Sequence, residues 1–413
     1  MLLMASAGFG LTQVAQSVLD SATPEHPVAA AAVWRFMRFH CDHTAWAGCA
    51  LWDLIQPAFM FMVGIALPWS IANRQARGEP FGRMFAHAVW RAVLLIALAI
   101  IFSSAYGKQT DWSFLNVLAQ IGLGYPFLFL LAFTGPRTPW IAAGALVVGY
   151  WAAFALHPLP PAGFDWPSVG VPADWPHHFN GFAAHWEKNF NFAATFDQWF
   201  LNRFPRAVGF VFGKGGYQTL NFIPSLATMT FGLIAGRLLR SDLTLRAKLL
   251  RLVIAGVVGI ALGALIEAAG LCPIVKRIWT PSWVLFSAGW VCLMLAGFVA
   301  VIEGGGWKRW AFPLVVVGLN PITLYTMFQL SGGFIRQELR IHSDVVKELV
   351  LPGGFLRQAL RIFFGQDLRI HSDQDLFAAF GKLWVPAMER GSVLLVMWLV
   401  VWWMYRRKIF LRL

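Results

Sequence analysis

The sequence predicts an all-α, polytopic membrane protein built as a bundle of about ten transmembrane helices. The 413-residue chain is 58% hydrophobic and only 13% charged, whereas a soluble domain averages about 25% charged residues. Apolar stretches close to the ~20 residues needed to cross the hydrocarbon core recur along the chain. Backbone polar groups in lipid must be satisfied within the segment, so these stretches are expected to be helices.

The apolar stretches give the order of the spans. The first runs from Met1 to about Val18 and lacks the charged leader of a signal peptide. Nine more are predicted at residues 51–73, 86–105, 113–133, 138–157, 217–239, 248–269, 281–302, 310–331 and 387–405. Ten spans place both termini on one side of the membrane. We treat residues 1–413 as a single transmembrane domain.

The basic residues assign the sides of the membrane. The net charge of +13 is concentrated at helix ends, so it favours the positive-inside rule over a nucleic-acid partner. The arginines and lysines of five segments fall on one face under the ten-span count, at residues 73–85, 134–139, 236–251, 303–309 and 406–412. We therefore predict an integral protein of a bacterial-type inner membrane with cytoplasmic termini, in contact with membrane lipid.

The opposite face is predicted to carry the longer connections, chiefly residues 20–50, 158–216 and 332–386. Residues 182–204 suit an interfacial amphipathic helix. The hexapeptide Leu-Arg-Ile-His-Ser-Asp occurs at 339–344 and again at 368–373, which is too little for a repeat architecture and suggests no chemical role. Cysteines lie in or near the outer segments, and either a disulfide or free thiols fits them: Cys41, Cys49 and Cys272.

The main candidate site precedes the second apolar segment. His40, Asp42 and His43 lie just before it, and Asp53 lies at its start. Ionisable groups near a bilayer are costly and usually mark a site, and histidine is suited to proton transfer near neutral pH. His43 is thus a candidate general base, acyl-accepting nucleophile or metal ligand, with a polar loop as an equally good alternative. No spacing signature supports zinc, so no metal is expected.

Three further stretches carry polar groups at positions that suggest a ligand-binding or structural role. Lys276 and Arg277 lie on the outer side against the positive-inside trend, where they would suit phosphate or carboxylate groups or form a basic loop. Asn320-Pro321 lies within a span and predicts a kink that lines a cavity, or hydrogen bonding between helices. Gly215-Gly216 precedes a helix whose free N–H groups would suit an anion, or it is an ordinary helix start.

Several short motifs, in this order, resemble the heparan-alpha-glucosaminide N-acetyltransferase family and its bacterial relatives, which are multi-span transmembrane acyltransferases. The first is His-Thr-Ala-Trp-Ala-Gly at 43–48, followed by Asp-Leu-Ile-Gln-Pro at 53–57. The others lie at residues 116–122, 231–236, 273–282, 320–325 and 405–410. The resemblance covers nearly the whole chain.

The resemblance implies an acyl-CoA-dependent N-acetyltransferase that takes acetyl from cytosolic acetyl-CoA and delivers it to an extracytoplasmic amino sugar or glycan. The family's catalytic histidine corresponds to His43. We predict that Asp53 orients or charge-balances this histidine. Expected contacts to acetyl-CoA or the acceptor come from Lys276, Trp279, Asn320 and Tyr325.

Other functions remain open from the sequence. A transporter or flippase for a glycan or lipid precursor would use His43 and Asp53 in a proton relay, although no clear inverted repeat is visible. A third interpretation is that the chain is a non-catalytic member of this family. The sequence does not decide between direct and ping-pong transfer, nor does it identify the natural acceptor or establish whether the chain forms a homodimer.

Overall fold

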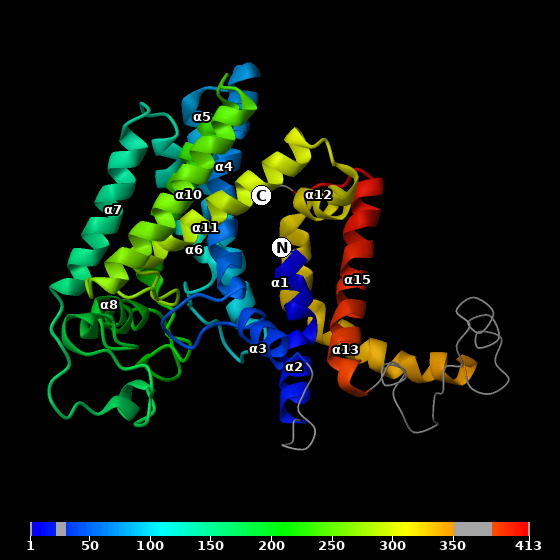
Figure 1. The fold of residues 1–413 in the computed structure, drawn as a ribbon, viewed down its shortest axis with the longest axis horizontal. Helices are drawn as coiled ribbons and strands as arrows, with labels where there is room; N and C mark the ends of the chain where they lie inside the picture. Colours follow the sequence, from blue (N-terminus) through cyan, green and yellow to red (C-terminus); the bar gives the residue numbers. More distant parts are fainter. Residues whose placement is uncertain (1, 22–29, 351–381, 412–413) are drawn as a thin grey trace. The chain divides into compact units, whose positions relative to one another are not determined.

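The computed structural model describes residues 2–21, 30–350 and 382–411 (Figure 1). These residues form helices, turns and loops, and the only β-type pairings among them are isolated bridges such as that between Ala47 and Val275. The predicted all-α class is therefore confirmed. The second copy of the duplicated hexapeptide, at 368–373, lies outside the described residues.

The chain divides into two compact units, which are described separately. The larger unit comprises Thr44–Cys49 and Asp53–Lys308, and the smaller comprises Met1–His43, Ala50–Trp52 and Arg309–Arg412. The single domain expected from the sequence stays a prediction.

Seven helices in the described residues are long and apolar enough to cross a membrane, or eight if one bent pair counts as a span. They include α4 (Ile55–Ala76), α5 (Phe81–Ser104), α7 (Thr138–Ala155), α9 (Phe222–Arg240), α10 (Leu245–Ala268), α11 (Pro281–Val299) and α15 (Val385–Arg406). The bent pair is α12 (Phe312–Leu319) and α13 (Pro321–Val350). Together with the shorter apolar α6 (Val117–Leu131), this set is roughly compatible with ten spans.

The first predicted span is interrupted in the structure. It consists of α1 (Leu2–Ser6), a short 3-10 turn and α2 (Leu11–Asp20). Gly8, Phe9 and Gly10 have φ values of 67°, 49° and 64°. These left-handed conformations are incompatible with a continuous right-handed helix, and glycine adopts them at little cost.

Close packing of glycines joins α4 and α9 in the larger unit. A Cβ added at Gly64 would lie 1.9 Å from the carbonyl oxygen of Met229, and one at Gly232 would lie 2.0 Å from that of Phe61. Backbones can approach this closely only where side chains are absent. Ile65 of α4 likewise faces Gly236 of α9, so the two helices run in the same direction.

A second glycine contact joins α10 to α11, which lie side by side in Figure 1. Gly263 faces Ser282 and Phe286, while Gly256 faces Leu293. The numbering rises along one helix as it falls along the other, so this pair is antiparallel.

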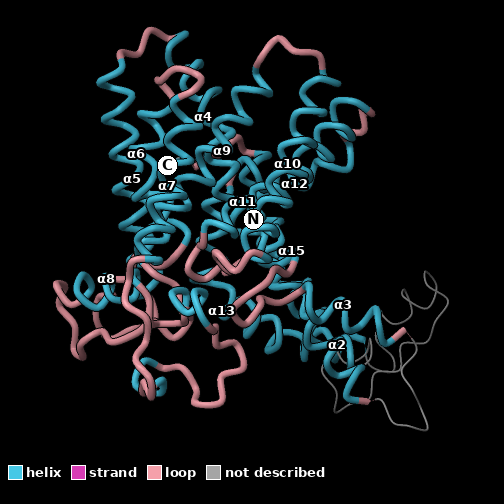
Figure 2. The backbone as a smooth tube through the Cα atoms, turned by 60° about the vertical axis from the view of Figure 1, so that its left-hand side comes forward, coloured by secondary structure: helices cyan, strands magenta, loops and turns pink. Residues whose placement is uncertain are grey.

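The helices of the larger unit define two ends. We call the end at which α4, α6, α9 and α11 begin the loop end, and the end at which they finish the basic end. The connection from α7 to α9, which includes α8 (Phe192–Leu201), lies at the loop end (Figure 2). The basic end carries the arginine-rich connections after α4, α6 and α9.

Three predicted connections contain helices. Residues 20–50 include α3 (Ala31–His40), and the predicted interfacial helix at 182–204 is divided into a 3-10 helix, Gly181–Trp186, and α8. The predicted connection from 332 begins as helix, because α13 continues to Val350. The helix meets no proline until Pro352, and proline cannot continue a helix ladder.

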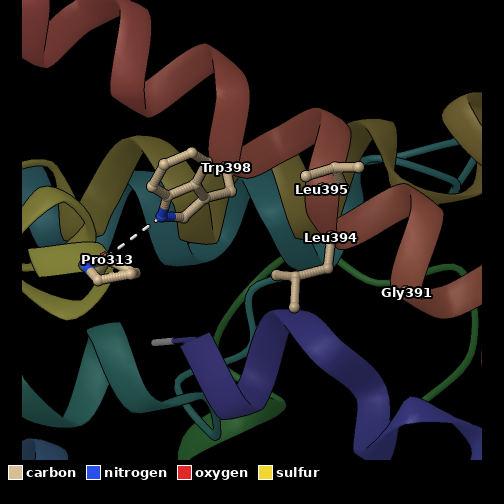
Figure 3. A pocket seen from close by; sticks show the side chains of 5 residues that line it. All are labelled: Pro313, Gly391, Leu394, Leu395 and Trp398. Atoms are coloured by element: carbon tan, nitrogen blue, oxygen red, sulfur yellow. Dashed lines mark hydrogen bonds between the residues drawn. The ribbon is translucent and has the colours of Figure 1, made fainter. Parts of the chain in front are cut away.

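The smaller unit has its own apolar core and a break within the α12–α13 pair. The two helices are bent by 71° at Asn320. Core residues come from α1, α12, α13 and α15, and include Ala5, Val316, Leu324 and Met397. Figure 3 shows an apolar pocket in this unit, in which the indole N–H of Trp398 donates to the carbonyl of Pro313 at 3.3 Å. The pocket's lining offers no acid or base for chemistry, since it consists of Pro313, Gly391, Leu394, Leu395 and Trp398.

Candidate active site at the loop end

A buried ion pair lies at the loop end of the larger unit. Asp53 lies in the 3-10 turn Leu51–Leu54 that leads into α4, and Lys276 lies in the connection between α10 and α11. The ammonium Nζ is 3.3 Å from Oδ1 of the carboxylate, and the side chains are 4% and 1% exposed. Two predicted site residues that are far apart in sequence are thus in direct contact.

The same carboxylate holds Thr44. Its Oδ2 accepts hydrogen bonds from the Thr44 backbone N–H at 3.2 Å and from the Thr44 hydroxyl at 3.1 Å. Asp53 therefore binds a separate loop. A carboxylate that only capped its own helix would bind N–H groups of that helix. Thr44 directly follows His43 in the chain.

The loop that carries Lys276 is fixed by Thr280. The Thr280 hydroxyl donates to the carbonyl of Pro273 at 2.8 Å and accepts from the N–H of Val275 at 3.0 Å. It also accepts from Trp283 at the start of α11. A network in which buried polar groups bond one another in this way holds the loop in one conformation.

Trp279 anchors this loop to α9. Its φ is 49°, a left-handed conformation that is costly for a bulky residue. Its side chain is fully buried, and the indole N–H donates to the Thr228 hydroxyl at 3.3 Å. The predicted contact between Trp279 and a ligand stays a prediction.

Arg277 joins two loops by binding their carbonyl groups. Its Nη1 donates to Gly215 at 2.7 Å, and its Nη2 donates to Thr44 at 3.4 Å. The ring of Tyr217 lies 5.6 Å from the guanidinium carbon and 5.9 Å from the Lys276 ammonium. The two predicted anion-binding cations thus have different partners, since Lys276 pairs with Asp53 and Arg277 bonds the backbone.

His43 belongs to the smaller unit and is exposed. Its backbone N–H donates to Asp42 at 2.7 Å, and the nearby His40 accepts from the Leu51 N–H through Nδ1 at 3.1 Å. Asp53 belongs to the other unit, so the pairing of His43 with Asp53 stays a prediction. Among the described residues, no group of three or more His, Cys, Asp or Glu side chains is arranged to hold a metal ion.

Asn320 and Tyr325 lie in the smaller unit and are not part of the Asp53–Lys276 cluster. Asn320 is fully buried at the helix break. Its side-chain amide donates to Ile409 and accepts from Leu411, both at 3.0 Å, so it ties the break to the segment after α15. The Tyr325 hydroxyl accepts from Gln329 at 3.2 Å.

The structure adds site residues that the sequence analysis missed. Thr44 is one, and its position beside His43 is the signal that could have identified it. Lys188 and Gln218 are others, at 9% and 2% exposed, and only the three-dimensional fold brings them to this region. Burial and then the nearby positive charge of Arg277 lower the pKa of Lys188.

The cysteines are free thiols, so the disulfide alternative does not hold. Burial, and then the carboxylate of Asp53, raise the pKa of Cys49 to about 12. A thiol is nucleophilic only as its thiolate, so Cys49 is a poor nucleophile at neutral pH.

Together, the apolar helices and the buried charged cluster at one of their ends indicate an integral membrane protein with a polar site at a membrane boundary. No protein-family model matches the sequence.

Among curated proteins, the chain is similar to heparan-alpha-glucosaminide N-acetyltransferase of Mus musculus, with 24% identity over 336 residues. The same enzyme of Homo sapiens is 21% identical over 337 residues. Each match covers 72% of this chain and 50% of the relative, so the chain spans about half the length of the curated relatives it matches. These similarities support relatedness to that family and suggest a transmembrane acetyltransferase.

Proposed function

We propose that this protein is a transmembrane acetyltransferase that transfers acetyl from acetyl-CoA to an amino sugar or glycan. The observation that carries the proposal is the buried Asp53–Lys276 pair, because Asp53 also binds Thr44, the neighbour of the candidate catalytic histidine. Acetyl-CoA would enter from the basic end, which the positive-inside rule makes cytoplasmic. The acceptor would bind at the loop end, on the extracytoplasmic side.

In the direct route, the acceptor nitrogen attacks the thioester carbonyl carbon while His43 takes a proton from that nitrogen. The carbon–sulfur bond breaks, and the coenzyme A thiolate receives the proton. In the ping-pong route, a ring nitrogen of His43 attacks the thioester carbonyl carbon, the carbon–sulfur bond breaks and coenzyme A leaves as its thiol. The acceptor nitrogen then attacks the acetyl-histidine and releases the imidazole. A covalently labelled protein after incubation with radiolabelled acetyl-CoA alone would identify the second route.

Asp53 acts in this proposal as a positioning residue. Its carboxylate, paired with Lys276, holds Thr44 and thereby fixes the backbone next to His43. Asp53→Asn and Thr44→Val should then lower kcat together while the acidic limb of the pH–rate profile stays in place. A limb that moves to lower pH in Asp53→Asn alone would instead show that the carboxylate favours the imidazolium directly.

The function is tested with purified protein, radiolabelled acetyl-CoA and a panel of amino sugars. We expect His43→Ala to lower transfer by about 10²–10⁴-fold, which is the usual contribution of a general base. His87→Ala is the matched control, because His87 is an exposed histidine within α5. Full transfer by the His43 variant would remove that residue from the mechanism.

A transporter is the second candidate, and the 71° break between α12 and α13 favours it. Transporters of several folds bind substrate where a span is interrupted. In sealed vesicles, uptake of a glycan precursor without acetylation, and its loss in Asn320→Ala, would support transport. Acetyl transfer by detergent-solubilised protein, in which no gradient exists, would support the enzyme.

A further inference from the structure

The turn at Gly215-Gly216, before α9, is predicted from the sequence as a candidate anion site. The structure shows which group binds the free N–H at the start of this helix. The turn closes with a hydrogen bond from the Gly216 N–H to the carbonyl of Gly213 at 2.9 Å. The first free N–H group, that of Thr219, donates to the carboxylate of Asp197 at 3.0 Å. The protein's own carboxylate therefore occupies the helix start.

Cations surround the other side of this turn. Arg277 bonds the carbonyl of Gly215 and, with Lys276, lies by the ring of Tyr217. A Cβ added at Gly216 would lie 3.5 Å from Cγ of Lys188 and 2.7 Å from the ring of Trp46. The side chains of Lys188, Arg277 and Trp46 thus approach one short segment from three elements.

The charges of this cluster do not balance within the described residues. Asp53 neutralises Lys276. Lys188 has its ammonium 4.7 Å from the centre of the Trp175 ring and forms no ion pair there, and Arg277 bonds uncharged carbonyl groups. Two positive charges in a largely buried region are costly without a counter-charge.

Buried polar groups in the same cluster also lack partners. Both the amide nitrogen and the amide oxygen of Gln218 are buried without a hydrogen bond in the described part of the chain, and the residue is 2% exposed. The Nε of Arg277 and the indole nitrogen of Trp46 are also buried without a hydrogen bond in the described part of the chain. An unsatisfied buried donor costs about 1–3 kcal/mol. Unsatisfied donors on side chains that meet at this turn, together with the excess positive charge, point to a bound anion.

We propose that Lys188, Arg277, Gln218 and Trp46 form a binding site for an oxyanion group. Carboxylate, sulfate and phosphate share the required chemistry, because each accepts several hydrogen bonds and carries negative charge. In the orientation of the proposed function the loop end binds the acceptor, so the group is assigned to the acceptor, and coenzyme A is the other source that the test distinguishes. This inference goes beyond acetyl transfer, and its binding test does not need turnover.

The test measures equilibrium binding of ³⁵S-labelled inorganic sulfate to the full-length protein in detergent at fixed ionic strength. Wild-type protein should bind sulfate saturably, and Lys188→Gln should bind at least tenfold more weakly. Lys188→Arg, which keeps the charge, should restore most of the binding. Lys214→Gln is the matched control, since Lys214 is an exposed cation of the same turn, and it should bind like wild type.

Competition assigns the source of the group. Displacement of sulfate by an amino sugar that carries a sulfate ester, but not by the unsubstituted sugar, assigns the site to the acceptor. Displacement by coenzyme A, but not by its dephosphorylated pantetheine portion, assigns it to the donor.

A folding defect is separated from lost binding by the melting temperature of each variant. Gln218→Leu, which removes the unpartnered amide, is a second variant that should weaken sulfate binding with little loss of stability. Sulfate binding that is absent, non-saturable or equal in Lys188→Gln and Lys214→Gln would overturn the site. Saturable binding in a protein that acetylates nothing would leave the site standing and refute the proposed function.

Discussion

Cations at the two ends of the larger unit have different partners. At the basic end, Arg237 donates to carbonyls at 2.9, 3.1 and 3.2 Å in and after the last turn of α6, and Arg240 donates to Pro68 at 3.3 Å. At the loop end, Lys276 faces a carboxylate and Lys188 faces an aromatic ring.

Helix direction explains the difference. The helices α4, α6, α9 and α11 all begin at the loop end, so their free N–H groups and positive dipole ends favour carboxylates there. Their free carbonyl groups lie at the basic end and favour cations. Arg237 therefore completes the end of α6 at the basic end. Lys276 lies in the loop that leads into α11, where a positive charge opposes the dipole of that helix, and its partner is a carboxylate.

The largest expected effect tests the buried pair at the loop end. Lys276→Met leaves the Asp53 charge buried without its partner, and breaking such a pair typically costs about 3–5 kcal/mol. The double variant Lys276→Met/Asp53→Asn should recover part of this loss, because no uncompensated charge remains. Thermal unfolding in detergent is measured for both single variants and for the double variant. The three values give the coupling free energy between Lys276 and Asp53. Additive losses would show that the pair is not coupled.

A second prediction concerns pH and Asp197, whose carboxylate is 1% exposed at the start of α9. Burial raises its pKa from 3.8 to about 6, although bonds from Thr219 and the charge of Arg206 act in the opposite direction. Between these values the folded protein keeps a proton that the unfolded chain releases. Stability from this group should therefore fall as pH rises from 3.8 to about 6, by roughly 3 kcal/mol.

Asp197→Asn removes this dependence, because asparagine keeps an oxygen to accept from Thr219 and does not titrate. The melting temperature of the variant should therefore change less over this pH range than that of wild type. Parallel curves for the two proteins would contradict the assignment.

The third prediction tests the basic end. Arg237→Met removes charged hydrogen bonds to the end of α6 and should cost about 2 kcal/mol, near the usual value for bonds to charged groups. Acetyl transfer per folded molecule should stay unchanged. Arg246→Met is the control, since Arg246 is an exposed residue in the first turn of α10 at the same end and its loss should leave the melting temperature nearly unchanged. Equal losses in the two variants would show that the bonds of Arg237 are not stabilising.

The smallest expected effect tests the helix starts at the loop end. The Asn116 side chain accepts from the N–H groups of Leu118 and Ala119, both at 3.1 Å. Asn116→Ala should cost about 1 kcal/mol, whereas Asn116→Ser keeps an oxygen that can accept from these N–H groups and should cost less. A melting temperature that is the same for both variants would show that capping contributes little here.

The sequence predicted the helices of the larger unit well because each span depends on local apolar length. It missed the interruption at residues 1–20, where Gly8 and Gly10 adopt left-handed conformations, and it did not give the length of α13, which continues to Val350. Asp53 and Lys276 were both named from the sequence, but their contact depends on the packing of α4 beside α11. Lys188 carries no local signal, since its role depends on Arg277 and the Gly216 turn.

The glycine contact between α4 and α9 restricts how an acyl group could travel through the larger unit. Gly64 and Gly232 bring the two backbones into van der Waals contact between residues 61–65 of α4 and 229–236 of α9, so no passage exists between the two helices along this stretch. Under the proposed function, a thioester arm that crosses from one membrane face toward the other would have to pass outside this α4–α9 contact.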